Sequence, residues 1–312
     1  MLDFSNSKIL IVGDVMLDKY YFGKVDRISP EAPVPIVNIQ KEESRLGGAS
    51  NVANNIVSLG GHSLLCGVIG HDLFGKEIER ISRHKNIDTF LLKTSSPTIT
   101  KARIIGGKQQ IVRVDYEDKS ELNADNKKLF RDTISRILPE YDILMISDYG
   151  KGLISEDLCR YLIKLAHKYD KKVIIDPKGK NWEKYSGADI VTPNVKELSD
   201  IVGYTVPNTD RAIEKAAREA ITNNHLTALL VTRSDKGMSL IGPIPPIHIP
   251  THSEEVFDVS GAGDTVVATL GLCLAAGFEI SEAMRTANIA AGIVVKKVGT
   301  ATLTIEELVQ QK

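Results

Sequence analysis

The chain has 312 residues, enough for one large domain or for one domain with an appendage. Its formal net charge of −1 argues against a nucleic-acid or other polyanion surface. The cysteines Cys66, Cys159 and Cys273 are odd in number and lack a zinc-ligand spacing, which favours a reducing cytoplasm. We expect neither a signal peptide nor a membrane partner, because no basic start leads into an apolar stretch and no apolar run is long enough to span a bilayer.

Short apolar runs alternate with helical patterns along the chain. The run Lys8–Val12 ends at Gly13-Asp14 and predicts a buried parallel strand. Residues 49–59 carry apolar side chains on one helical face and stop at Gly60-Gly61. Further strand-like runs are Leu64–Ile69, Asp142–Ile146, Lys172–Ile175, Ala188–Val191 and Ala228–Val231, and Thr304–Glu307 is a capping box that opens a last helix. The alternation predicts an α/β fold whose mostly parallel sheet has helices on both faces.

Two stretches break this alternation. Asp26–Gln40 contains three prolines in a β-like run, and Thr98–Asp115 combines β-branched with basic residues. Because proline cannot donate to a ladder, it is excluded from a central strand. We therefore predict a small peripheral sheet, from about residues 19–40 and 97–115, that could act as a lid; a pair of long surface loops is the alternative.

A Gly-rich segment, Asp258–Thr265, leads into an apolar helical stretch. We expect the backbone N–H groups of Gly261, Ala262 and Gly263 to be free at the positive end of the helix dipole, an arrangement that binds phosphate. Asp264 follows in the first helical turn. It is either an acid favoured by the helix dipole or a base that takes a proton from a hydroxyl group.

Polar residues follow the predicted strands at the edge where α/β folds place their sites. Each segment alone could be a turn, but five of them beside an anion-binding helix start predict a functional site. They contain Asp14; Asp148 and Lys151; Asp176 and Lys178; Asn194 and Glu197; and Thr232, Ser234 and Gly237. Gly70–Glu77 nearly matches a Walker A loop, but Glu77 replaces the Ser or Thr that would hold Mg²⁺, so we predict a strand–loop–helix turn there. The lack of a Gly-x-Gly-x-x-Gly motif after the first strand disfavours a dehydrogenase.

Three ordered motifs, Gly47–Asn55, Asn194–Glu197 and Asp258–Thr265, resemble those of the ribokinase-like, or PfkB, carbohydrate kinases. The resemblance covers essentially the whole chain. It implies one ribokinase-like kinase domain over residues 1–312, a three-layer sandwich with a small β lid. No His-x-Gly-His motif of a nucleotidyltransferase is present, so we expect a stand-alone kinase or an isolated kinase half.

Finer features resemble one branch of that family, the D-glycero-D-manno-heptose 7-phosphate kinases. These enzymes phosphorylate the anomeric hydroxyl in the ADP-heptose pathway of bacterial surface polysaccharides. The segments that carry this likeness are Gly13–Asp18, Arg27–Pro35, Thr98–Lys101, Asp176–Gly179 and Val231–Ser234. The alternatives are another PfkB kinase, acting on fructose phosphate, ribose or a nucleoside, and a catalytically idle sugar- or nucleotide-binding protein.

The resemblance implies a role for each matching residue. Asp264 would be the base, and Gly261, Ala262 and Gly263 would stabilise charge on the transferring phosphoryl group. Asn194 and Glu197 would hold Mg²⁺–ATP through metal-bound water. The nucleotide would also contact Val195, Lys196, Thr232, Ser234, Gly237, Lys178 and Asn288, and the sugar would contact Asp14, Gly47, Gly48, Asn51, Lys101, Arg103 and Asp148.

A second phosphate on the acceptor would need cations. Lys101, Arg103, Arg113 and Lys151 are candidates, and a solvated basic strand face is the other interpretation. The family resemblance also allows a monovalent-cation site near Asp258 and the Gly299-Thr300 loop. The edge strands of a lid often pair with another subunit, so we expect a cytoplasmic homodimer whose partner is a small sugar phosphate and not a nucleic acid.

Overall fold

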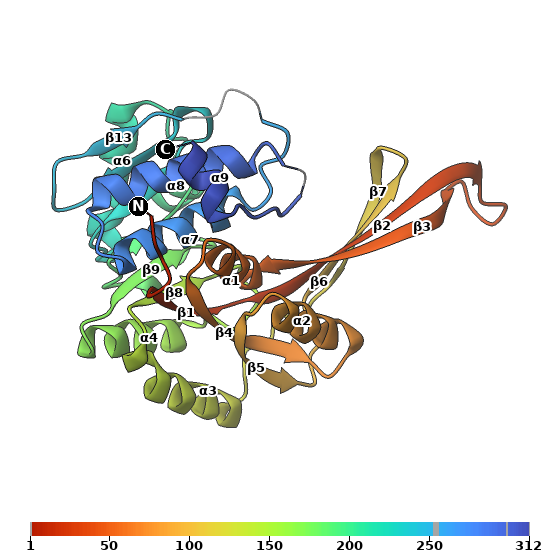
Figure 1. Ribbon diagram of the computed structural model, residues 1–312, viewed down its shortest axis with the longest axis horizontal. Helices are drawn as coiled ribbons and strands as arrows, with labels where there is room; N and C mark the ends of the chain where they lie inside the picture. Colours follow the sequence, from red (N-terminus) through yellow and green to blue (C-terminus); the bar gives the residue numbers. More distant parts are fainter. Residues whose placement is uncertain (1, 252–255, 298, 312) are drawn as a thin grey trace.

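A nine-stranded sheet forms the centre of the molecule in this computed structural model, which describes residues 2–251, 256–297 and 299–311 (Figure 1). The strands pair in the order β13-β12-β11-β10-β9-β8-β1-β4-β5. The pairs from β11 to β5 are parallel, whereas β12 and β13 return antiparallel at one edge. The strands are β1 Lys8–Gly13, β4 His62–Gly70, β5 Asp88–Thr94, β8 Ile143–Ser147, β9 Lys172–Asp176, β10 Ile190–Val191, β11 Leu229–Thr232, β12 Met238–Ile241 and β13 Ile247–Ile249.

Helices cover both faces of this sheet because successive strand residues point to opposite sides. In β1, Ile9 and Ile11 pack into one apolar core, while Leu10 and Val12 pack into the other. The first face is covered by α1 Ala49–Ser58, α2 Leu73–His84, α7 Ala262–Ala275, α8 Ile280–Val294 and α9 Ile305–Gln310; the second by α3 Ala124–Ile137, α4 Glu156–Lys168, α5 Val195–Val202 and α6 Asp210–Asn224. The predicted α/β sandwich is confirmed. None of the helices in the described ranges is both long and apolar enough to cross a membrane.

Some elements differ from those expected. β5 was not predicted, because it is an edge strand whose side chains are half or fully exposed and so form no continuous apolar run. β12 and β13 are additional short strands, and β10 occupies only the last two residues of the expected Ala188–Val191 strand. The near-Walker segment is a strand–loop–helix turn as predicted: β4 ends at Gly70, and Asp72 caps α2 by accepting from the Gly75 N–H at 2.8 Å.

A second, four-stranded sheet extends from the main body as a long arm, and we call it the lid (Figure 1). Its order is β3-β2-β6-β7, with β2 and β6 parallel and the other pairs antiparallel. The strands are β2 Val15–Ile28, β3 Pro35–Gly48, β6 Thr100–Gly106 and β7 Gln109–Tyr116. Pro30 and Pro33 lie in the turn between β2 and β3, and Pro35 is the first residue of β3. The peripheral sheet is therefore confirmed, but β3 continues beyond the expected limit and leads directly into α1.

Candidate active site

Helix α7 begins at the Gly-rich segment. Gly261 precedes it with a φ of 80°, and a Cβ there would lie 2.9 Å from the Asn51 amide nitrogen, so glycine suits this position on both counts. A Cβ at Gly263 would meet no described atom within 4 Å, which leaves that side of the helix start open. The expectation of a free N–H at Ala262 is wrong, because a tight turn lets this group donate to the Val259 carbonyl at 3.2 Å.

Asp264 lies in the first turn of α7, and hydrogen bonds reach both of its carboxylate oxygens. The Asn51 amide donates to Oδ2 at 2.7 Å, and the Tyr149 hydroxyl donates to Oδ1 at 2.7 Å. Burial raises the pKa of Asp264 to about 6, and the two hydrogen bonds oppose that rise. A carboxyl with this pKa is ionised at neutral pH and close to the pH at which a general base is most effective.

Asn51 and the glycine pair come together at the junction of β3 and α1. Gly48 ends β3 with a φ of 55°, and Asn51 lies in the first turn of α1. A Cβ at Gly47 would lie 2.6 Å from Oδ2 of Asp18, so glycine lets this carboxylate of β2 approach. Asp18 also raises the pKa of Asp264, which places both acids at one site. Our sequence analysis assigned no role to Asp18, because its motif contains two acids and does not show which of them lies near Asp264.

Asp14 contacts the loop that follows β8, and Asp148 is the first residue of that loop. Oδ2 of Asp14 accepts from the backbone N–H groups of Tyr149 at 2.8 Å and Lys151 at 3.0 Å. Oδ1 of Asp148 accepts from the Gly150 N–H at 2.7 Å. These bonds hold the turn that carries Tyr149. The predicted contacts of the two acids with the sugar stay predictions.

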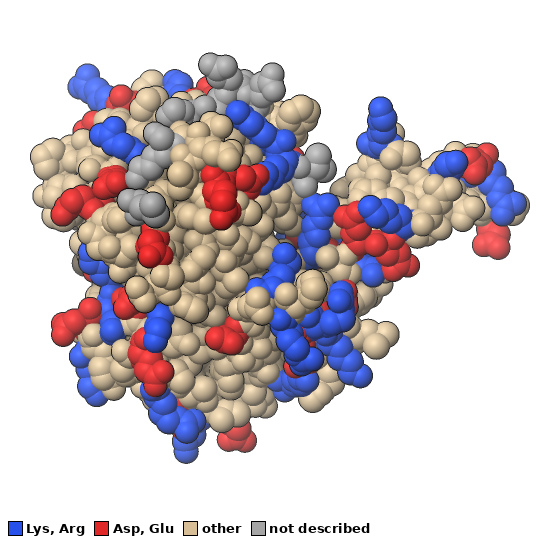
Figure 2. Space-filling view, viewed as in Figure 1, with Lys and Arg blue, Asp and Glu red and all other residues tan. Residues whose placement is uncertain are grey.

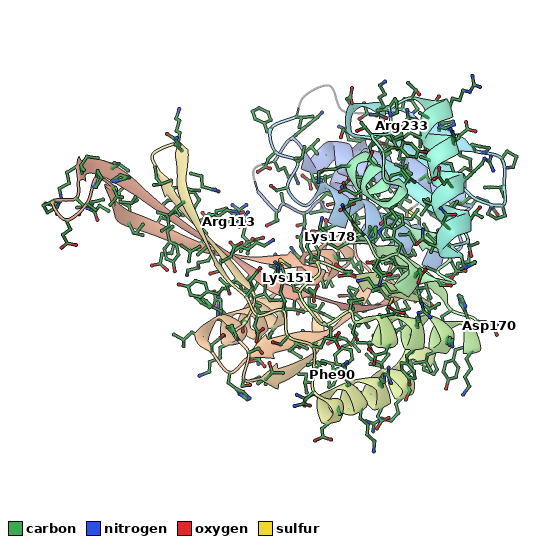
Figure 3. The ribbon with its side chains drawn as sticks, turned by 180° about the vertical axis from the view of Figure 1, so that it is seen from behind. Phe90, Arg113, Lys151, Asp170, Lys178 and Arg233 are labelled. Atoms are coloured by element: carbon green, nitrogen blue, oxygen red, sulfur yellow. The ribbon has the colours of Figure 1, made fainter. Side chains whose placement is uncertain are left out.

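The inner face of the lid, on the side of Asp18, carries a group of cations. Residues that pair across strands share a face of the sheet, and β2 places Asp18 opposite Arg45 of β3 and Lys101 of β6. The same face continues to Arg103 and its partner Arg113 of β7. In Figure 3, Arg113 lies on the lid, and Lys151 lies where the lid meets the main body.

Most of these cations are paired with acids. Arg103 pairs with Asp18 at 2.6 Å, Arg45 with Glu43 at 3.0 Å and Arg113 with Asp115 at 2.8 Å, and Lys151 pairs with Glu117. Burial and three neighbouring cations lower the pKa of Lys101, and Asp18 opposes them. Arg45 was not predicted, because only the pairing of β3 with β2 shows that it lies opposite Asp18. A bound anion would relieve the repulsion around Lys101.

A cavity of about 180 Å³ opens beside the start of α7. It gathers the predicted strand-end segments with the Gly-rich helix start. Its lining includes Asp148, Tyr149, Asp176, Lys178, Thr192, Asn194, Glu197, Thr232, Gly261, Gly263 and Asp264. In Figure 3, Lys178 lies on the main body, and a Cβ at Gly150, the neighbour of Lys151 in the chain, would lie 3.8 Å from the Lys178 side chain.

Asn194 and Glu197 form a capping box at the start of α5. The Asn194 side chain accepts from the Glu197 N–H at 2.9 Å, and Oε2 of Glu197 accepts from the Asn194 N–H at 3.1 Å. The other oxygen of Glu197 pairs with Nζ of Lys178 at 2.8 Å, which raises the pKa of the lysine. The motif therefore stabilises a helix start and presents a carboxylate and an ammonium group to the cavity.

Residues 6–307 match the sequence model of the pfkB family of carbohydrate kinases. The chain belongs to this family. As a pfkB carbohydrate kinase it is an ATP-dependent phosphotransferase, which agrees with a buried carboxylate at a Gly-rich helix start.

This pfkB kinase is similar to proteins named bifunctional protein HldE. It is 46% identical over 308 residues to HldE of Haemophilus influenzae strain PittEE, covering 98% of this chain and 63% of the relative. It is 45% identical over 310 residues to HldE of Vibrio vulnificus, covering 99% and 64%. The chain thus spans less than two thirds of the length of these relatives.

Solved structures confirm the ribokinase-like fold. Phosphofructokinase-2 from Escherichia coli in complex with potassium superposes with a TM-score of 0.80 at 20% identity, over 97% of each chain. Arabidopsis thaliana ribokinase complexed with ribose and ATP superposes with a TM-score of 0.76 at 19% identity, over 98% of each chain. At this identity the likeness concerns the fold alone.

The donor atoms of the cavity fit a magnesium ion that keeps most of its water. Asp176, Asn194 and Glu197 bring oxygen donors to one cavity, and Mg²⁺ favours oxygen ligands. No cluster of three or more His, Cys, Asp or Glu side chains arranged to hold a metal occurs among the described residues. Mg²⁺ is often held by one or two carboxylates plus phosphate and water, so this pfkB kinase does not need such a cluster.

Other residues predicted at the nucleotide lie outside the described lining of this cavity: Val195, Lys196, Ser234, Gly237 and Asn288. The Lys196 side chain is 87% exposed, and the Asn288 amide donates to the Pro250 carbonyl at 2.6 Å. Their contacts with nucleotide stay predictions. At the predicted monovalent-cation site, Oδ2 of Asp258 accepts from the Gly299 N–H at 2.8 Å.

Gly299 also touches the lid. Its φ is 72°, and a Cβ there would lie 2.1 Å from Nη1 of Arg45. The Arg45 side chain of β3 therefore lies beside Gly299, whose N–H donates to Asp258.

Proposed function

We propose that this pfkB kinase phosphorylates the anomeric hydroxyl of D-glycero-D-manno-heptose 7-phosphate, with ATP as donor, in ADP-heptose biosynthesis. The resemblance of five segments to heptose 7-phosphate kinases supports the sugar. The single observation that carries the proposal is the cationic inner face of the lid beside Asp18, because a sugar phosphate brings a second anion to the site.

Asp264 would take the proton of the acceptor hydroxyl. Asn51 and Tyr149 hold its carboxylate plane, and Asp18 would accept hydrogen bonds from sugar hydroxyls. Bound Mg²⁺–ATP supplies the phosphoryl group. The positive helix end at Gly263 would stabilise the negative charge that builds up during transfer.

Glu197 and Asn194 would hold Mg²⁺ through water, and Lys178 would reach the phosphates from its place beside Glu197. On the acceptor side, Arg103 and Lys101 would bind the remote phosphate, with Arg45 and Arg113 nearby. Arginine suits this task because its planar fork can bind phosphate through two hydrogen bonds.

A substrate screen tests the proposal. ATP consumption would be measured with heptose 7-phosphate, unphosphorylated heptose, fructose 6-phosphate, ribose and a nucleoside. We expect the highest kcat/KM with heptose 7-phosphate. A preference for an unphosphorylated sugar would overturn the sugar-phosphate assignment, and absence of ATP turnover with every acceptor would favour an idle binding protein.

We also propose that the chain works as a homodimer in the cytoplasm. The lid exposes apolar side chains that a second copy could cover: Val25, Ile28, Val34, Ile39, Val112 and Val114. Light scattering should give twice the chain mass, and Val112→Lys with Val114→Lys should lower it. The three cysteines are buried thiols, in keeping with a reducing compartment.

A further inference from the structure

We propose that Tyr149 is a positioning residue that holds Asp264 in the orientation and ionised state it needs to take the acceptor proton. This inference rests on the proposed role of Asp264 as the base. The phenol donates to Oδ1 at 2.7 Å while Asn51 donates to Oδ2 at 2.7 Å. Two donors on different oxygens fix the plane of the carboxylate, and the remaining lone pairs stay available for a substrate hydroxyl.

The turn that carries Tyr149 is itself fixed by buried acids. Asp14 accepts a hydrogen bond from the Tyr149 N–H at 2.8 Å, and Asp148 accepts one from the Gly150 N–H at 2.7 Å. Gly150 has a φ of 65°. Asp148 in turn accepts from the Tyr185 hydroxyl at 2.7 Å. The phenol is thus held in place before a substrate arrives, as positioning of a catalytic group requires.

Tyr149 cannot replace Asp264 as the base. Burial, followed by the charges of Asp264 and Asp176, raises the pKa of Tyr149 well above its ordinary value, so the phenol stays a neutral donor. The charge of Asp18 raises the pKa of the Asp264 carboxyl, whereas Lys101 and the Tyr149 phenol lower it. Removing the phenol should therefore raise the pKa of Asp264 and leave less of the ionised base at neutral pH.

The test is Tyr149→Phe, which keeps the ring and removes the hydroxyl. With heptose 7-phosphate as acceptor, we expect kcat to fall about tenfold, the order expected for one hydrogen bond to a charged group. The acid limb of the profile of kcat against pH should move to higher pH, and the Kd for ATP should stay unchanged. Tyr161→Phe on α4, where the tyrosine ring contacts Arg131, is the matched control and should change neither kcat nor the position of the acid limb.

A second variant covers the case in which Tyr149→Phe fails to fold. Site-specific 3,5-difluorotyrosine at position 149 keeps the shape and makes the phenol a stronger donor, so the acid limb should move to lower pH. The inference would be overturned if the acid limb of the kcat profile lay at the wild-type pH in both variants. It would also be overturned if kcat fell and that acid limb did not move.

Failure of the proposed function gives a different result. If wild type prefers fructose 6-phosphate or ribose, the heptose assignment fails, and the same two variants are measured with the preferred acceptor. If Asp264→Asn keeps its activity, Asp264 is not the base and the inference about Tyr149 falls with it.

Discussion

The two sides of the Asp264 cavity are built in different ways. On the nucleotide side, Asn194 and Glu197 bond to each other within one helix start, and Gly261 to Asp264 form another. On the acceptor side, Asp18 meets Arg45 and Lys101 only because three strands of the lid pair in one register. The nucleotide side is therefore local in sequence, and the acceptor side depends on the packing of a whole sheet.

This difference suggests how specificity can change without loss of phosphoryl transfer. Under the proposed function, substitutions on the inner face of the lid should alter which acceptor binds, while the helix starts assigned to the nucleotide stay intact. Substitutions on the nucleotide side should affect every acceptor equally. Kinetic constants for the two substrates can therefore separate the two regions.

The largest effect is expected where both sides meet. Asp264→Asn should lower kcat by about 10²–10⁴-fold, the usual loss on removal of a general base, with ATP binding retained. Steady-state rates at saturating substrates and titration calorimetry with ATP measure this. A variant with more than about half of the wild-type rate would exclude Asp264 as the base.

The same substitution that lowers kcat should raise the thermal stability of the protein. Burial raises the pKa of Asp264 in the folded state to about 6, above its ordinary value. The folded state therefore binds this proton more tightly than the unfolded state does. As the pH rises from about 4 through 6 the proton is lost, and the free energy of unfolding falls. Asp264→Asn should unfold at a higher Tm than wild type at pH 8, and the gap should shrink at pH 5. An equal gap at both pH values would contradict the raised pKa.

Between the two sides, Lys184 pairs with Asp148, whose side chain is 1% exposed. Lys184→Met would leave this carboxylate buried with the Tyr185 hydroxyl and the Gly150 N–H but without its cation. We expect the free energy of unfolding to fall by about 3–5 kcal/mol, as for other broken buried pairs. Urea denaturation measures the change, and Lys196→Met at an 87% exposed side chain is the control.

Arg103→Ala should affect mainly the acceptor side. It should raise the KM for heptose 7-phosphate about tenfold or more, because a hydrogen bond to a charged group contributes roughly 1.5–3 kcal/mol. Binding that is equal in ground and transition states appears mainly in KM, so kcat should fall less. Lys19→Ala on the opposite face of β2 is the control. Equal losses with unphosphorylated heptose would mean that Arg103 only supports the lid.

Glu197→Gln should give the smallest effect, on the nucleotide side. We expect a few-fold rise in the Mg²⁺ concentration for half-maximal rate and a lower maximal rate, because a carboxylate that holds metal-bound water is replaced by an amide. The KM for the sugar should stay near wild type. An unchanged Mg²⁺ dependence would remove Glu197 from the metal site.

The sequence predicted the local features well. Apolar runs predicted most central strands, and the two irregular stretches predicted the lid. The short motifs indicated Asp264 and Asn194 as candidate site residues. The residues that were missed, Asp18, Arg45 and Tyr149, reach the site through strand register or through a turn shaped by glycines. Neither periodicity nor motif spacing encodes such relations, because they depend on pairings between segments distant in the chain.

The contact between Gly299 and Arg45 joins the two regions mechanically. A sugar phosphate that draws Arg45 inward would shift the loop that holds Asp258, and this loop leads into the helix start that serves the nucleotide. Binding free energies are reciprocal, so whatever factor the acceptor applies to ATP affinity, ATP must apply to acceptor affinity. If the acceptor moves this contact, a single loop glycine would couple acceptor and donor affinities in a site whose two walls are otherwise built separately.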